Sequence, residues 1–136
     1  MRLRVDRLVG IAAVAGASLT VLAPVAAQAP TLAMLDRLDR GEWLVRFRDS
    51  GEQRRVCLRT GRELIQLRHG EAQCSRYVVE DGAGQVTVQY SCPGNGYGRT
   101  SVRRESGSLA QIESQGIADG KPFQFTAEGR RVGACR

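Results

Sequence analysis

Residues 75–91, SRYVVEDGAGQVTVQYS, are the stretch that decides the fold. Residues 85–91 alternate, with Val86, Val88 and Tyr90 on one face, and a glycine-containing turn separates them from a β-prone run at 75–81. Alternation with a period of two is typical of a half-buried strand, and short glycine-rich turns join antiparallel strands. The stretch therefore predicts a β-hairpin.

The same signals recur on both sides of this hairpin. Short alternating segments, separated by turns rich in Gly, Asp and Ser, lie at 42–48, 54–58, 99–105, 109–115 and 122–128. Regular spacing of such segments is typical of an antiparallel sheet. We expect a mainly β fold (small α+β): an antiparallel meander of about seven strands forming a curved sheet or open barrel, with one or two short helices and two disulfides.

The alternation also predicts which side chains form the core. On the apolar faces of these strands stand Trp43, Val45, Phe47, Val86, Val88, Tyr90, Phe123 and Phe125. Large apolar side chains are most often buried in a core, and we interpret these residues so. The alternative is that the aromatic side chains line a ligand cavity.

Two short helices are expected outside the strands. Thr31 can cap a helix that carries leucines at helical spacing and ends at Gly41. Thr60 and Glu63 have the spacing of a capping box, in which each side chain bonds the backbone of the other. The apolar residues that follow predict a second helix, closed by Gly70, over one face of the sheet.

The first 29 residues have the layout of a secretory signal peptide. An arginine-rich head precedes an apolar run of about 16 residues, shorter than a membrane span requires, and small residues then form a cleavage region. We expect residues 1–27 to be a cleaved signal peptide, with 1–29 as the alternative and an uncleaved anchor as a weaker one. Residues 28–136 then form one disulfide-stabilised β domain, periplasmic or secreted, without a stable membrane anchor.

Four cysteines, Cys57, Cys74, Cys92 and Cys135, follow this leader. An even number of thiols in an oxidising compartment favours two disulfides, and four cysteines allow three pairings. We prefer Cys57–Cys74 and Cys92–Cys135, because the first bridge would close the base of the segment between two strands. A redox-active or zinc-binding role would need a close pair such as C-x-x-C, which the sequence lacks. We therefore expect no metal and no cofactor.

The order of these cysteines carries a family resemblance. Gly41-Glu42-Trp43, Cys57-Leu58, Cys74 at the start of a hairpin, Tyr90-Ser91-Cys92 and the ending Gly129-Arg130-Arg131-Val132-Gly133-Ala134-Cys135 occur in that order. The pattern resembles the small exported bacterial proteins grouped as domain of unknown function family 3617. The resemblance implies an exported, disulfide-linked β domain and implies no reaction.

A search for catalytic groups gives little. The single histidine, His69, lies in a loop, and we interpret it as a surface residue. A catalytic site would need it beside Glu71 or Glu80 in a pocket. The adjacent carboxylates Glu80 and Asp81 are expected to form an acidic turn, and residues 94–98 (GNGYG) lack the Lys-Ser/Thr of a phosphate loop and predict a turn with positive φ.

The net charge of +6 comes mostly from arginine, including the pairs Arg54-Arg55, Arg103-Arg104 and Arg130-Arg131. We interpret these pairs as solvated strand positions, and export argues against a nucleic-acid partner. The sequence favours a non-catalytic binding or interaction domain whose partner is an envelope protein or a small apolar ligand. The alternatives are a small-ligand or lipid carrier with a cavity between sheet and helices, an inhibitor presenting the loop 93–98, and, least favoured, an enzyme.

Overall fold

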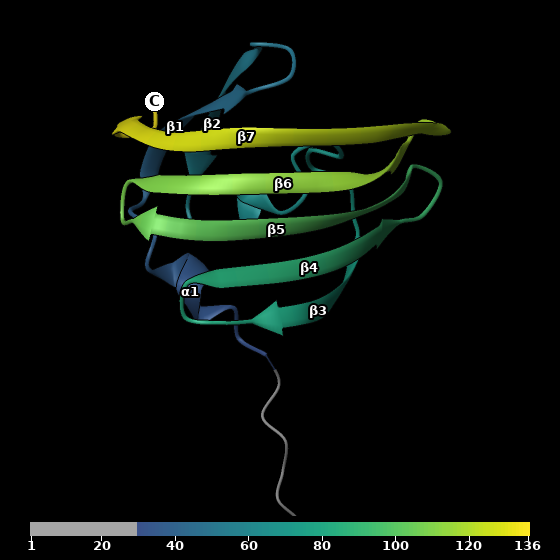
Figure 1. Cartoon of the computed structure of the whole chain (residues 1–136), viewed down its shortest axis with the longest axis horizontal. Coiled ribbons are helices and arrows are strands. Elements are labelled where there is room, and N and C mark those ends of the chain that lie inside the picture. The colour runs from purple at the N-terminus through teal and green to yellow at the C-terminus, as the bar shows by residue number, and fades with distance from the viewer. Residues whose placement is uncertain (1–29) are drawn as a thin grey trace, which may run out of the picture.

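A computed structural model describes residues 30–136 (Figure 1). The predicted signal peptide lies outside the described residues, so that prediction stays untested. Among residues 30–136, no helix is long and apolar enough to cross a membrane.

One antiparallel sheet of seven strands forms the body of the domain, as the sequence predicts. The strands are β1 (Gly41–Phe47), β2 (Gln53–Leu58), β3 (Ser75–Asp81), β4 (Gln85–Cys92), β5 (Gly96–Ser106), β6 (Leu109–Ala118) and β7 (Lys121–Gly133). Their order across the sheet is β2-β1-β7-β6-β5-β4-β3, so β2 and β3 are its two edges.

The strands from β3 to β7 follow one another as a meander of hairpins. The predicted hairpin is present as β3 and β4, with Tyr77 opposite Gln89 and Val78 opposite Val88. The first hairpin, β1 with β2, is added on the far side of β7, where Val45 pairs with Gly129. The sheet bends, so that β1 and β2 lie behind the plane of β3–β7 in Figure 1.

The core lies on the inner face of the bent sheet. Seven of the eight side chains predicted for it are buried, and Phe123 is partly buried against it. The inner face is covered by the crossing segment (residues 59–74), which connects β2 to β3 and buries Leu64 and Ile65 completely. A short 3-10 helix, η1 (Arg62–Leu64), stands where the sequence predicts a helix.

The first helix is shorter than expected. Only α1 (Ala33–Asp36) is helical, and Leu32 takes a left-handed conformation (φ 56°) in place of a side-chain cap by Thr31. The spacing of the leucines nevertheless serves the core, because Leu32, Leu35 and Leu38 are all buried.

The preferred disulfide pairing is wrong. The structure joins Cys57 to Cys135, with Cα atoms 5.5 Å apart, and Cys74 to Cys92, with Cα atoms 4.2 Å apart. The reason for the first bridge is the position of β7. Because β1 separates β2 from β7, Glu42 pairs with Cys57 on one side and with Gly133 on the other, which brings the C-terminal tail to Cys57.

The second bridge follows from the register of the β3–β4 hairpin. Ser75 pairs with Ser91, so the next residues outward, Cys74 and Cys92, face each other at the open end of the hairpin. All four cysteines are in disulfides, as expected.

Candidate functional site

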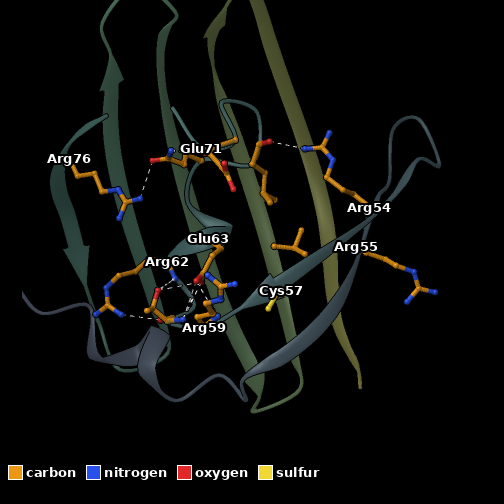
Figure 2. Close-up of a pocket in the computed structure, with 13 residues that line it drawn as sticks. Arg54, Arg55, Cys57, Arg59, Arg62, Glu63, Glu71 and Arg76 are labelled. Atoms are coloured by element: carbon orange, nitrogen blue, oxygen red, sulfur yellow. Dashed lines mark hydrogen bonds between the residues drawn. The ribbon is translucent and has the colours of Figure 1, made fainter. Parts of the chain in front are cut away.

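A groove of about 590 Å³ lies between the edge strand β2 and the crossing segment, and reaches Arg76 on the opposite edge strand β3 (Figure 2). The bend of the sheet turns its two edges toward this opening, and the crossing segment fills the space behind it. Five arginines and two glutamates line the groove together with apolar and polar groups: Arg54, Arg55, Val56, Cys57, Arg59, Thr60, Arg62, Glu63, Gln66, Leu67, Gly70, Glu71 and Arg76.

The capping interaction at the start of the crossing segment is present in modified form. A carboxylate oxygen of Glu63 accepts hydrogen bonds from the backbone amides of Arg59 (3.1 Å) and Thr60 (3.2 Å). The bond from Glu63 to the backbone of Thr60 is the one that the capping box predicts. The Thr60 hydroxyl accepts from the amide of Arg62 (3.3 Å) instead of from that of Glu63. The difference follows from the tight 3-10 turn, and the charge of Glu63 is thereby committed to the backbone.

Three of the five arginines are held by neighbouring acceptor groups. Nη1 of Arg62 lies 2.7 Å from Oδ1 of Asp36, and Nη1 of Arg55 lies 2.6 Å from Oε2 of Glu42. Arg54 donates to the carbonyl of Leu67 (2.7 Å), which lines the groove, and its Nη2 lies 3.3 Å from Oε1 of Glu52. The Asp36–Arg62 hydrogen bond holds the pKa of the Asp36 carboxyl below its usual value.

Arg76 is held differently, by a neutral amide. Nε2 of Gln66 donates to the carbonyls of Gly70 (2.8 Å) and Ala72 (2.9 Å), so its Oε1 is left to accept from Nη2 of Arg76 (3.0 Å). Gln66 is 8% exposed, so the anchor is rigid. The dashed line in Figure 2 marks this bond between the crossing segment and β3.

Arg59 and Glu71 complete the charges of the groove. Both are exposed, and neither side chain makes a hydrogen bond or ion pair with any residue among 30–136. Within the described part of the chain, the groove therefore presents two cations without a carboxylate partner, Arg59 and Arg76, and one carboxylate without a cationic partner, Glu71. The sequence analysis missed Arg59, Gln66 and Arg76, because no local pattern distinguishes them from other polar residues.

His69 is not on the surface, contrary to our expectation. It is 6% exposed, because the crossing segment packs it against the inner face of the sheet. Its Nε2 lies 2.9 Å from the carbonyl of Asn95 and 3.1 Å from that of Ile117, and carbonyls only accept, so Nε2 carries a proton. In the neutral ring, Nδ1 then accepts from the Tyr90 hydroxyl at 3.0 Å.

Tyr90 belongs to a small polar cluster inside the core. The Thr100 hydroxyl lies 2.8 Å from that of Ser114 and also hydrogen-bonds the carbonyl of Ile65, so the sheet and the crossing segment are joined there. Burial raises the pKa of the Tyr90 phenol, while hydrogen bonds with Ser114 and Thr100 act in the opposite direction. No buried side-chain oxygen or nitrogen among residues 30–136 lacks a partner, which indicates a structural cluster.

The other candidate groups are dispersed. Glu80 accepts from the side chains of Gln85 and Thr87, and Asp81 accepts from the backbone amides of Thr31 and Leu32. Neither Glu80 nor Asp81 makes a hydrogen bond with His69, so the structure does not bring these carboxylates and the histidine together as a catalytic site would need. In the loop 93–98, Gly94 (φ 77°) and Gly96 (φ 103°) have the positive φ predicted for this turn.

Within the described residues, no group of three or more His, Cys, Asp or Glu side chains is arranged to hold a metal ion. Comparisons with protein-family models, with curated proteins and with solved structures found no match. The resemblance to family 3617 therefore stays a prediction from the order of the motifs. The class that fold and groove define is a disulfide-linked, open antiparallel β domain with an arginine-lined groove between its sheet edges.

Proposed function

We propose that this protein is an exported, non-catalytic binding domain of the cell envelope, and that its ligand occupies the groove between β2 and the crossing segment. The two disulfides support an oxidising compartment such as the periplasm or the exterior. The signal-peptide pattern of the first 29 residues points the same way.

The observation that carries the proposal is the composition of the groove. It combines an apolar wall, Val56 and Leu67, with two guanidinium groups, Arg59 and Arg76, that no carboxylate within residues 30–136 neutralises. Binding sites in proteins commonly pair an apolar lining with a few oriented polar groups. The buried Gln66 provides such orientation for Arg76.

A catalytic role has less support. The chain has one histidine, and both of its ring nitrogens lie within hydrogen-bond distance of other protein groups, the Tyr90 hydroxyl and the carbonyls of Asn95 and Ile117. All four cysteines are in disulfides.

Carboxylates can also serve in general acid–base or nucleophilic chemistry. In the groove, however, Glu63 accepts from the backbone amides of Arg59 and Thr60, which leaves Glu71 without a second catalytic group beside it among the described residues.

A carrier for a small apolar ligand is the second candidate, because a volume of about 590 Å³ would suit a small molecule. Against it, Leu64 and Ile65 fill the space between the crossing segment and the sheet, where an enclosed cavity would be needed. An open, charged groove fits the interaction domain better.

The test is position-specific photo-crosslinking in a cell that exports the protein. A photoreactive phenylalanine analogue at Glu71 lies on the groove, and the same group at Gln115 lies on the exposed outer face of β6. We expect adducts from position 71 that position 115 does not give. Equal adducts from both positions, or none from position 71, would contradict the proposal, and an adduct to a small molecule would favour the carrier.

A further inference from the structure

The outer edge of β2 is an unpaired strand edge. Within the described part of the chain, β1 is its sole partner in the sheet, and no other backbone hydrogen bond involves residues 53–58. Its register with β1 runs from Gln53 to Leu58 without a bulge. An edge of this kind presents alternate N–H and C=O groups that can pair with another strand.

The opposite edge of the sheet differs from β2. In β3 the register shifts between Val78 and Glu80, so the strand carries a bulge at Val79. Bulges interrupt the ladder and turn an edge away from pairing. Of the two edges, β2 is therefore the one suited to accept a further strand.

This regular edge is also a wall of the groove. Residues 54–57 line it on one side, and the crossing segment and Arg76 face them (Figure 2). A strand of six residues is about 20 Å long, which gives room for about five residues of an added strand. Addition of an extended peptide to a free edge beside a groove is an established mode of recognition.

The charges of the groove select the sequence of such a peptide. Arg59 has no ion-pair partner among the described residues, and Arg76 meets only the amide oxygen of Gln66. A guanidinium uses one or two donors in such contacts and has five, so both groups can still bind a carboxylate.

We infer that the groove binds an acidic polypeptide segment in extended conformation, which adds as a strand to β2 and places its carboxylates against Arg59 and Arg76. This inference rests on the proposed function and names its partner class. Backbone pairing with β2 supplies position, and the two arginines supply selectivity for acidic side chains.

The test measures binding of a fluorescein-labelled hexapeptide of alternating Glu and Val by anisotropy, using the oxidised protein. We expect R59E and R76E each to weaken binding at least about tenfold, as loss of one charge-assisted contact implies. R99E, on the exposed outer face of β5, is the matched control and should bind as the parent does. R76Q, which removes charge without adding repulsion, should give an intermediate loss.

Backbone pairing is tested with two N-methylated versions of the peptide. One is methylated at its odd-numbered residues and the other at its even-numbered residues. A peptide strand added to β2 pairs through only one of the peptide's two edges, and its amides alternate between these edges. We therefore expect one methylated peptide to bind at least about tenfold more weakly and the other to bind as the unmethylated peptide does. Equal binding by both methylated peptides would overturn strand addition.

Two further probes separate the peptide from other anions. Vesicles of phosphatidylglycerol and a soluble polyuronate are titrated against the same variants. If either binds with dependence on Arg59 and Arg76 while the peptide does not, the acidic-peptide inference is overturned and the groove as a binding site is kept. Absence of groove-specific adducts from position 71 would instead overturn the proposed function itself.

Discussion

Oε1 of Gln66 accepts a hydrogen bond of 3.0 Å from Nη2 of Arg76, and this bond joins the crossing segment to the edge strand β3. Gln66 is buried, while Arg76 is exposed at the groove. A neutral, rigid anchor therefore holds a cation at the surface without cancelling its charge. The binding account depends on this arrangement together with the open edge of β2.

The two disulfides should contribute unequally to stability. The Cys57–Cys135 bridge spans 78 residues and the Cys74–Cys92 bridge spans 18. Chain-entropy estimates give about 4.5 and about 3 kcal/mol respectively. We expect C57S/C135S to lower the free energy of unfolding more than C74S/C92S, measured by urea unfolding at neutral pH.

The pairing itself can be read from a non-reduced proteolytic digest by mass spectrometry. The structure predicts a peptide pair joining Cys57 to Cys135 and another joining Cys74 to Cys92. Recovery of Cys57 linked to Cys74 from protein refolded under oxidising conditions would contradict the strand order described above.

Gly98 should tolerate no side chain. A Cβ at this position would overlap the phenol oxygen and ring of Tyr90, which is buried and hydrogen-bonded to His69. We expect Gly98→Ala to cost about 1–3 kcal/mol of stability, the usual range for overpacking. Gly84→Ala is the matched control, because nothing lies within 4 Å of its Cβ.

Both variants are compared by thermal and urea unfolding. A change of less than about 0.5 kcal/mol for Gly98→Ala, equal to that of the control, would mean that Tyr90 does not pack as described.

Stability should fall in alkaline solution because of Tyr90. Burial raises the pKa of its phenol above the ordinary value of 10.0. Below pH 10 the folded and unfolded chains both keep the proton, so this contribution is fully present. Above it, the unfolded chain loses the proton first, and the free energy of unfolding falls by up to about 1.4 kcal/mol per pH unit until the folded pKa is passed.

The measurement compares Y90F with the parent protein by urea unfolding between about pH 9 and about pH 11. The variant lacks the titrating group, so its stability should decline less steeply. Parallel profiles would show that Tyr90 titrates alike in the folded and unfolded states.

Glu63 should stabilise the start of the crossing segment. Its carboxylate accepts from the backbone amides of Arg59 and Thr60, so Glu63→Ala leaves both without that acceptor. We expect a loss of about 0.5–2 kcal/mol, the range for helix caps. Glu63→Gln keeps an acceptor oxygen and should lose less, and an equal loss for both variants would point to charge instead of capping.

The strands and the core could be predicted because their signals are local. Alternation in 42–48 and 85–91 specified which residues turn inward, and Trp43 and Tyr90 are buried as expected. The Cys74–Cys92 bridge could also have been predicted from the sequence, because these cysteines directly flank the predicted hairpin at 75–91.

The remaining features depend on contacts between distant segments. The Cys57–Cys135 bridge requires β7 to lie beside β1, and no local pattern specifies that neighbour. His69 is buried because the crossing segment packs on the sheet. The local sequence around a loop residue does not reveal such packing. The groove arises from the same packing, so Arg59, Gln66 and Arg76 became candidates only in the structure.

The most direct measurement of the binding account is amide hydrogen exchange of β2 with and without the acidic hexapeptide. The inner amides of residues 53–58 already pair with β1, and the outer edge makes no backbone hydrogen bond with any described residue. We predict that saturating peptide slows exchange at alternate amides of β2 and leaves β3 unchanged. Unchanged exchange in β2 at saturation, or protection of β3 in its place, would contradict the account.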